Sequence, residues 1–260
     1  MAEEHKAGVF RRRGPGDGFE AMPAAEGPWT EGHCHGGAPA ALLADALIAA
    51  PALVPMSLAR ITVDLLGPVP LGMPLRTMVR ILRDGRRLQL LEAELVGDGR
   101  CLARATGLRV RAVEPVKEMP LVHPDPDPAG HAPMPGGFSS QFTIVPQRGR
   151  FGEPGPAEAW FRLNSPLVAG AATDAVTRAV AAADFAAGIS HELSFHDWLF
   201  PTLDLTVGFT RPPQGDWTLI EANWLGTAHG RTICASRLSD RHGVYGQALQ
   251  TLLIEPRPAQ

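Results

Sequence analysis

The segment Ile61-Thr62-Val63-Asp64-Leu65 is matched, at a constant offset of 144 residues, by Leu205-Thr206-Val207-Gly208-Phe209. Residues 61–110 and 205–254 align without a gap and share seven identities in fifty positions. These identities fall at the opening of a strand, at the proline that ends it and at a glycine turn before the last strand. The period is longer than the roughly 20–50 residues of solenoid repeats. The alignment therefore predicts two tandem copies of one small domain.

Each copy shows the period-two alternation of β-strands. Ile61, Val63 and Leu65 share one face of the first strand, and polar residues occupy the other face. Asp84-Gly85 and Gly97-Asp98-Gly99 interrupt the pattern and are typical of tight hairpin turns. We expect strands at residues 61–65, 75–82, 87–96 and 101–110 of the first copy, and at 204–210, 217–224, 231–238 and 244–254 of the second.

A helix is predicted before each set of strands. Leu43, Ala46, Leu47 and Ala50 recur at i, i+3, i+4 and i+7, after Pro39 in the first turn. In the second copy, Thr173 or Asp174 is the predicted cap of a helix that ends at Gly188. A helix followed by an antiparallel meander is an α+β arrangement.

The two copies suggest the domain organisation. We expect an N-terminal domain at residues 1–114 and a C-terminal domain at residues 157–260. Residues 115–156 contain ten prolines and little periodicity, so we interpret them as a crossover linker. This linker is expected to hold at most a short edge strand near Phe142–Val145.

Composition excludes several classes of function. The net charge of −3 gives no electrostatic footprint for nucleic acid. No apolar stretch approaches the roughly 20 residues of a membrane-spanning helix, and residues 1–6 lack the apolar core of a secretory signal. The three scattered cysteines argue against a disulfide framework. We therefore expect a cytoplasmic protein.

Several short motifs resemble those of one family. Residues 32–40, Gly-His-Cys-His-Gly-Gly-Ala-Pro-Ala, are similar to the Gly-Gly start of the first helix in bacterial type II acyl-CoA thioesterases and their thioesterase-like relatives. Leu82-Arg83-Asp84-Gly85 resembles a turn of these proteins, and residues 203–212 resemble their Asp-bearing strand that ends in Arg-Pro. The resemblance covers roughly residues 17–112 and 158–255. It implies a double hotdog fold, in which two tandem antiparallel sheets each wrap a helix.

The resemblance also implies an activity and its residues. Family members usually hydrolyse acyl-CoA thioesters with an Asp, a Thr or Ser, and a Gln, which orient and activate a water without an acyl-enzyme. On this resemblance the Asp is Asp204 and the Gln is Gln250, with Gln247 as a fallback. The hydroxyl position falls near Asn223, and Thr227 is the nearest hydroxyl.

Other residues are candidates for substrate binding. The amides of Gly36 and Gly37, at the start of a helix, could polarise a carbonyl; the two glycines would also let the chain turn tightly. His35 adjoins them, and Arg83 could meet the phosphates of CoA or simply lie in a solvated turn. Asp204 has an alternative interpretation as a strand residue that bonds loop amides, and Asn223 and Gln250 as ordinary strand amides.

Other chemistries find little support. His33, Cys34 and His35 are adjacent, so their side chains diverge on an extended chain, and no second group of ligands has matching spacing. We predict no metal and no cofactor. The sequence has no Gly-x-Ser-x-Gly elbow and no Gly-rich phosphate loop.

The leading hypothesis is a cytoplasmic thioesterase that acts on an acyl-CoA or acyl-carrier thioester. The alternative is a non-hydrolytic module that binds acyl-CoA or lipid. A hotdog dehydratase would need a His shortly after its Asp, and residues 205–210 contain none. A homodimer or larger assembly is expected, because outer sheet faces would carry aromatics such as Trp217 and Trp224.

Overall fold

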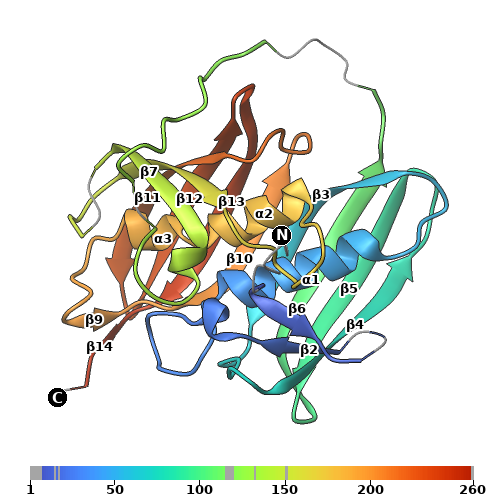
Figure 1. Cartoon of the computed structure of the whole chain (residues 1–260), viewed down its shortest axis with the longest axis horizontal. Helices are drawn as coiled ribbons and strands as arrows, with labels where there is room; N and C mark the ends of the chain where they lie inside the picture. Colours follow the sequence, from blue (N-terminus) through green and yellow to red (C-terminus); the bar gives the residue numbers. More distant parts are fainter. Residues whose placement is uncertain are drawn as a thin grey trace, which may run out of the picture.

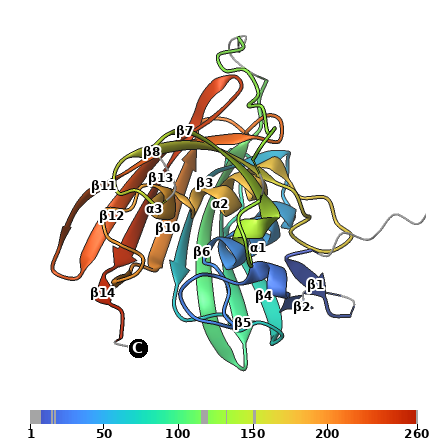
Figure 2. The same ribbon diagram turned by 60° about the vertical axis from the view of Figure 1, so that its left-hand side comes forward.

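One curved sheet organises the molecule. The computed structural model describes residues 8–14, 16, 18–114, 120–131, 133–149 and 152–258. Twelve strands form a sheet in the order β1-β2-β4-β5-β6-β3-β10-β13-β12-β11-β8-β7, and every pairing in it is antiparallel. Helices α1 (Gly37–Ala49) and α2 (Ala175–Ala183) lie on the concave side of this sheet (Figures 1 and 2).

The N-terminal half follows the predicted order of helix and meander. Its strand β5 alternates between buried and partly exposed positions, and its buried face packs against α1. The bounds of the strands in this half are β1 (Phe10–Arg12), β2 (Gly18–Ala21), β3 (Met56–Leu65), β4 (Pro74–Arg83), β5 (Leu88–Gly97) and β6 (Arg100–Arg111), with a short 3-10 turn η1 (Pro23–Ala25) before α1.

The C-terminal half repeats this arrangement. Its elements are η2 (Ser139–Gln141), β7 (Phe142–Arg148), β8 (Ala157–Leu163), α2, α3 (Ala186–Ile189), β9 (Trp198–Leu199), β10 (Thr202–Phe209), β11 (Thr218–Ala228), β12 (Arg231–Asp240), β13 (Gly243–Leu253) and β14 (Glu255–Pro256). The short β9 and β14 pair with each other. The edge strand expected near Phe142–Val145 is β7, at one end of the sheet.

The two halves meet where β3 pairs with β10. Thr62 lies opposite Thr206, and their hydroxyls are 3.1 Å apart. The flanking pairs, residue 61 with 207 and residue 63 with 205, are related by symmetry about that point. The offset seen in the sequence therefore corresponds to a pseudo-twofold axis between these threonines, and the two sheets are continuous, as predicted.

The second half departs from prediction in two details. Asp174 caps α2 by accepting a hydrogen bond from the amide of Val176 (2.8 Å), as expected, but the helix ends at Ala183 and a separate α3 follows. Both tryptophans expected on the outer faces are buried, but Trp217 packs with Trp160 in a small cluster separate from the main core, whereas Trp224 belongs to the main core. Trp224 donates its indole N–H to the carbonyl of Ala187 on the inner side.

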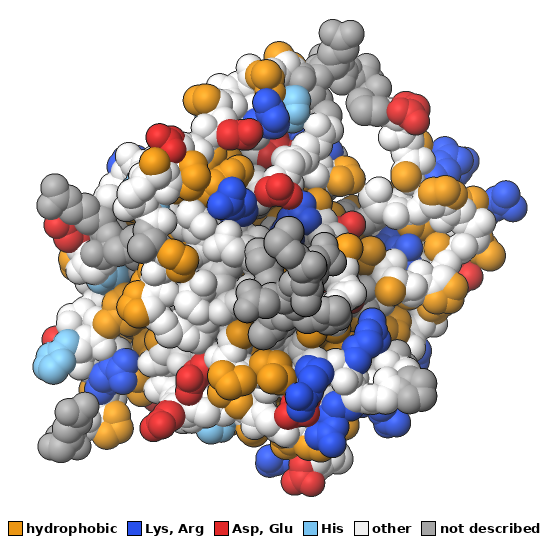
Figure 3. Space-filling view, viewed as in Figure 1, with side chains coloured by type: hydrophobic (Ala, Val, Ile, Leu, Met, Phe, Trp, Pro, Cys, Tyr) orange, Lys and Arg blue, Asp and Glu red, His pale blue; other side chains and the backbone are white. Residues whose placement is uncertain are grey.

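The surface carries charges of both signs. Figure 3 shows acidic and basic side chains interspersed with apolar ones over one face of the molecule. In the described part of the chain, no helix combines the length and apolar character needed to cross a bilayer.

Candidate active site

A carboxylate, a hydroxyl and an amide meet below the end of α2. Asp184 is buried, and its Oδ1 accepts hydrogen bonds from the hydroxyl of Thr202 (2.9 Å) and the amide Nε2 of Gln250 (2.8 Å). Nε2 of Gln250 also lies 3.1 Å from the Thr202 hydroxyl. The three side chains therefore form one closed cluster.

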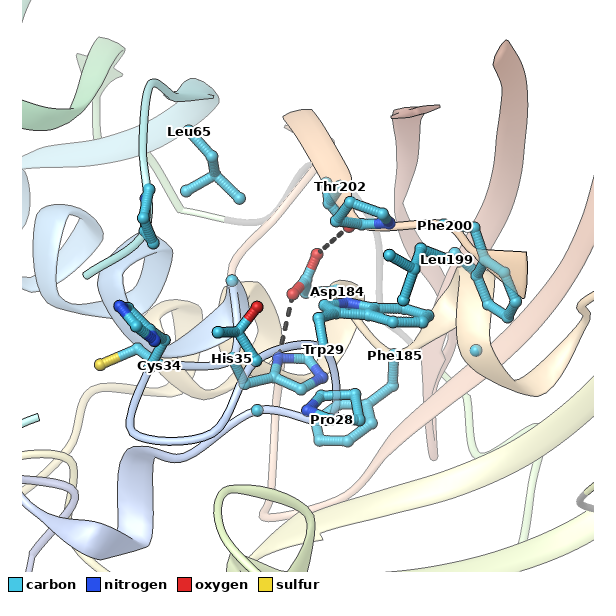
Figure 4. A pocket seen from close by; sticks show the side chains of 18 of the residues that line it. Pro28, Trp29, Cys34, His35, Leu65, Asp184, Phe185, Leu199, Phe200 and Thr202 are labelled. Atoms are coloured by element: carbon cyan, nitrogen blue, oxygen red, sulfur yellow. Dashed lines mark hydrogen bonds and ion pairs between the residues drawn. The ribbon is translucent and has the colours of Figure 1, made fainter. Parts of the chain in front are cut away.

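The N-terminal half contributes to the same cluster. Nδ1 of His35 lies 3.0 Å from Oδ2 of Asp184, and the amide of Gly37 donates a hydrogen bond to the same Nδ1 (3.1 Å). Figure 4 shows Asp184 between His35 on one side and Thr202 on the other. The cluster thus joins the loop before α1 to the second half of the molecule.

The carboxyl of Asp184 stays ionised. Burial by itself would raise its pKa, but the adjacent His35, the hydroxyl of Thr202 and the nearby amide of Gly37 lower that pKa below its ordinary value. Asp184 is therefore a carboxylate held by donors.

A cavity of about 850 Å³ opens beside this cluster. Asp184, Thr202, His35 and Gly36 lie in its wall, and much of the remainder is apolar. Trp29, Phe185, Phe195 and Phe200 supply aromatic surface, and Trp29 packs against both Phe195 and Phe200. A large, mostly apolar cavity with a few convergent polar groups is typical of a small-molecule site.

Local irregularities in the chain bring the polar residues inward. Asp184 caps the end of α2, in the break before α3. A register shift between Thr202 and Asp204 lets Thr202 reach the concave side of β10. Gln250 shares the buried face of β13 with Ala248 and Leu252.

The glycines fit this crowded junction. A Cβ atom at Gly37 would lie 2.8 Å from the carbonyl oxygen of Ala181 and 3.2 Å from Cβ of Asp184. At Gly36 it would lie 2.9 Å from Oδ2 of Asp184. Both glycines therefore allow α1 to start against the end of α2.

Three of the predicted catalytic residues lie away from the cavity. Asp204 follows the register shift, so it misses the inner face and accepts a hydrogen bond from the amide of Thr251 (2.9 Å). Asn223 and Thr227 are exposed on β11. Among the four residues predicted from the resemblance, only Gln250 lies in the cluster.

The predicted binding residues divide in the same way. His35 and Gly36 line the cavity and Gly37 adjoins it, whereas Arg83 is exposed at the end of β4 and is absent from the cavity wall. Cys34 lines the cavity, but its sulfur points away from Asp184 (Figure 4) and burial raises its pKa to about 12. It is therefore a poor nucleophile. Within the described residues, no group of three or more His, Cys, Asp or Glu side chains is placed to hold a metal ion.

Family models match both halves of the chain. The acyl-CoA thioesterase C-terminal domain matches residues 116–254, and the acyl-CoA thioesterase N-terminal domain matches residues 25–110. The chain belongs to the acyl-CoA thioesterase family. No curated protein sequence matches it significantly.

Solved structures support the fold of this thioesterase family member. A hot dog fold protein of unknown function from Alicyclobacillus acidocaldarius is 18% identical, with a TM-score of 0.74 and coverage of 100% of both chains. The tesB protein of Mycobacterium avium subs paratuberculosis is 17% identical, with a TM-score of 0.67 and coverage of 94% of this chain and 96% of that one. The acyl-CoA thioesterase II TesB2 of Mycobacterium marinum is 14% identical, with a TM-score of 0.64 and coverage of 93% and 94%. The predicted double hotdog fold is confirmed.

The cluster combines the residue types that the resemblance implies, but two of its members are not the residues predicted from the sequence. The Asp and the hydroxyl of the cluster are Asp184 and Thr202. Asp184 stands out in the sequence as an acid within an Ala-rich apolar run, which is a signal of a buried functional group. For Thr202 the sequence offers no comparable signal, because its orientation depends on the register shift.

Proposed function

We propose that the protein hydrolyses an acyl thioester, presented by CoA or by an acyl-carrier protein, to a free acid and a thiol. The observation that carries this proposal is the cluster of Asp184, Thr202 and Gln250 in and behind the wall of a large apolar cavity. The aromatic part of the wall would receive the acyl group, and the cluster would hold the attacking water. This role would place the protein in fatty acyl metabolism.

The substrate carbonyl needs a donor for the negative charge that develops on its oxygen. The amide of Gly37 is occupied by Nδ1 of His35. Gly36 lines the cavity at the N-terminus of α1, and its amide donates no hydrogen bond within the described part of the chain. We assign polarisation of the carbonyl to this amide and to the positive end of the helix.

A specific observation favours hydrolysis over non-hydrolytic binding. A non-hydrolytic binding module would be favoured by the absence of a hydroxyl beside the Asp and the Gln. Thr202 supplies that hydroxyl, 2.9 Å from Asp184 and 3.1 Å from Gln250. All three groups that the resemblance implied for hydrolysis are thus available at one place.

We extend the proposal to organisation, assembly and location. The N-terminal unit would comprise residues 1–114 and the C-terminal unit residues 157–260, with β7 completing the second sheet. Leu225, Ile233 and Leu249 are 62%, 44% and 50% exposed on neighbouring strands of the second half, which suits a homodimer. All three cysteines are free thiols, which suits the reducing cytoplasm.

A panel of acyl-CoAs with a thiol-reactive dye tests the proposal. We expect release of free CoA from at least one member of the panel. Asp184→Asn keeps the shape of the side chain but removes its charge, and we expect it to lower turnover by about 10²–10⁴-fold. Asp204→Asn, on the same sheet but outside the cavity, is the matched control and should retain turnover. Tight binding of acyl-CoA by the unmodified protein without CoA release would favour the binding module.

A further inference from the structure

The two ends of the cavity differ in exposure. At one end the start of β10 lies beside the end of β3, and Leu66 and Leu203 in the cavity wall are 57% and 41% exposed. The other end, which we call the acyl lobe, is lined by buried side chains, those of Phe185, Ala187, Ile189 and Phe200. Figure 4 shows Leu65 and Phe200 on opposite sides of Asp184. An apolar acyl group would therefore enter the acyl lobe, while the thiol part of the substrate leaves over the exposed leucines.

An aromatic stack from both halves of the molecule closes the acyl lobe. The indole of Trp29 stacks on the ring of Phe195, with centroids 5.6 Å apart and an angle of 15° between the planes. It also meets the ring of Phe200 edge-on, with centroids 4.7 Å apart. Trp29 belongs to the loop before α1, whereas both phenylalanines belong to the segment between α3 and β10.

Both sides of this stack are anchored to the rest of the fold. In the loop that presents Trp29, the amide of Gly27 donates to the carbonyl of His33 (2.8 Å). On the other side, Nε of Arg257 donates to the carbonyl of Phe195 (2.8 Å), and β14 pairs with β9 in the same segment. The stack is therefore a fixed part of the cavity wall.

Gly188 leaves space in the acyl lobe next to the stack. A Cβ atom at Gly188 would have only the ring of Phe195 within 4 Å, at 3.9 Å, which is ordinary van der Waals contact. Gly36 and Gly37 differ, since a Cβ atom at either would lie closer than 3.0 Å to its neighbours. The backbone of Gly188 lies outside the left-handed region, so α3 would accept a side chain there. A glycine at this position of the wall keeps the end of the lobe free.

We propose that Trp29 determines the length of the acyl group that the protein accepts. This inference rests on the proposed function. The last carbons of a short or medium-length acyl group would pack between Gly188 and the stack of Trp29 on Phe195, and a longer chain would meet the indole. Each methylene buried before that point should raise kcat/KM roughly fourfold, and further methylenes should lower it.

A series of acyl-CoAs from butyryl to palmitoyl tests this role. For the unmodified protein we expect kcat/KM to rise with chain length, reach a maximum and then decline. Trp29→Ala removes the wall, so the maximum should move to longer chains, and the ratio of kcat/KM for palmitoyl-CoA to that for hexanoyl-CoA should rise by about 10-fold or more. Measured with both substrates in competition, this ratio does not depend on how much of the variant is folded.

Two further variants sharpen the test. Trp198→Ala is the matched control, because it removes a partly buried tryptophan of the same segment that is absent from the cavity wall, and it should leave the ratio unchanged. Gly188→Leu fills the acyl lobe from the opposite side, so it should move the maximum to shorter chains. An unchanged ratio in Trp29→Ala, or an equal rise in Trp198→Ala, would overturn the proposal.

The failures of the two proposals can be told apart. If CoA were released but the maximum stayed in place in Trp29→Ala, hydrolysis would stand and the role of Trp29 would fall. If no CoA were released from any substrate, the proposed function would fail, and the dissociation constants of the same acyl-CoAs, measured by calorimetry, would report on the lobe. An unchanged order of affinities in Trp29→Ala would then overturn the role of Trp29 as well.

Discussion

Two threonines on β10 have different roles, one at the cavity and one in the pairing of the two halves. Thr202 donates to Asp184 at the cavity, whereas Thr206 pairs with Thr62 where the two halves join. Thr202→Val keeps the shape and removes one donor, so we expect turnover to drop by about 10²-fold or more. Thr206→Val is the matched control, because it makes the same change away from the cavity. Steady-state kinetics of both variants would decide, and equal losses would contradict the assigned role.

A second buried carboxylate, that of Asp240, makes the stability of the fold depend on pH. Asp240 accepts two hydrogen bonds from Arg211 (2.6 and 2.7 Å) and two from the amides of Gln214 and His242. Burial alone would raise its pKa, but Arg211 and these amides lower it below the ordinary value of 3.8. The stabilisation is therefore fully present above that value and is lost as the pH falls through the lower pKa of the folded state.

The variant Asp240→Asn tests this linkage. Removing one partner of a buried pair reduces the free energy of unfolding by about 3–5 kcal/mol. Urea unfolding from neutral to acidic pH should show this difference as constant above the ordinary carboxyl pKa and shrinking below it. A difference that grew as the pH fell would contradict the assignment.

At the residue scale, the resemblance implied which chemical groups to expect, but it led to only one residue of the cluster. That residue is Gln250, and the alternation of β13 puts it on the same face as Ala248 and Leu252. Asp184 and Thr202 could not be placed, because one sits in a helix break and the other beside a register shift. Neither a helix break nor a register shift repeats at a regular spacing, so the hydrophobic periodicity of the sequence does not reveal it.

At the scale of elements, α1 starts in close contact with the end of α2. A methyl group at Gly37 would lie 2.8 Å from the carbonyl oxygen of Ala181 and 3.0 Å from the ring of Phe138. We expect Gly37→Ala to destabilise the fold by about 1–3 kcal/mol, as overpacking does. Gly208→Ala on β10, where nothing lies within 4 Å, is the control. Thermal unfolding of both variants would measure the difference, and an equal shift would argue against tight helix packing.

The elements themselves were largely predictable. Period-two alternation and the Asp-Gly turn located the strands of the first meander, because each of its faces has a different environment. The end of the second helix was placed too late, because Ala-rich sequence continues through the break at Asp184 into α3. Burial of Trp224 was missed because its indole finds a partner, the carbonyl of Ala187, that only the folded chain supplies.

At the scale of the whole molecule, the junction of β3 with β10 makes each half depend on the other. Separation would leave the backbone N–H and C=O groups of both strands unpaired at exposed sheet edges, and exposed sheet edges promote aggregation. Residues 1–114 and 115–260, produced separately, should aggregate or remain unfolded, whereas together they should reassemble. Size-exclusion chromatography would test this, and two well-folded monomeric halves would contradict it.

The pseudo-twofold axis also relates the cavity of the second half to a region of the first half that has no equivalent polar cluster. A register shift after Leu58 repeats the one after Thr202, and Gly107 pairs with β3 as Gln250 pairs with β10. A Cβ at Gly107 would lie 3.0 Å from Leu47 and 3.3 Å from Leu58, so leucines fill the space that polar groups occupy in the second half. The duplicated halves have thus specialised, one keeping the reactive groups and the other becoming their support.

Calorimetric titration with a non-hydrolysable acyl-CoA analogue should accordingly find one ligand per chain, and two equivalent sites would show that the halves had not diverged in this way.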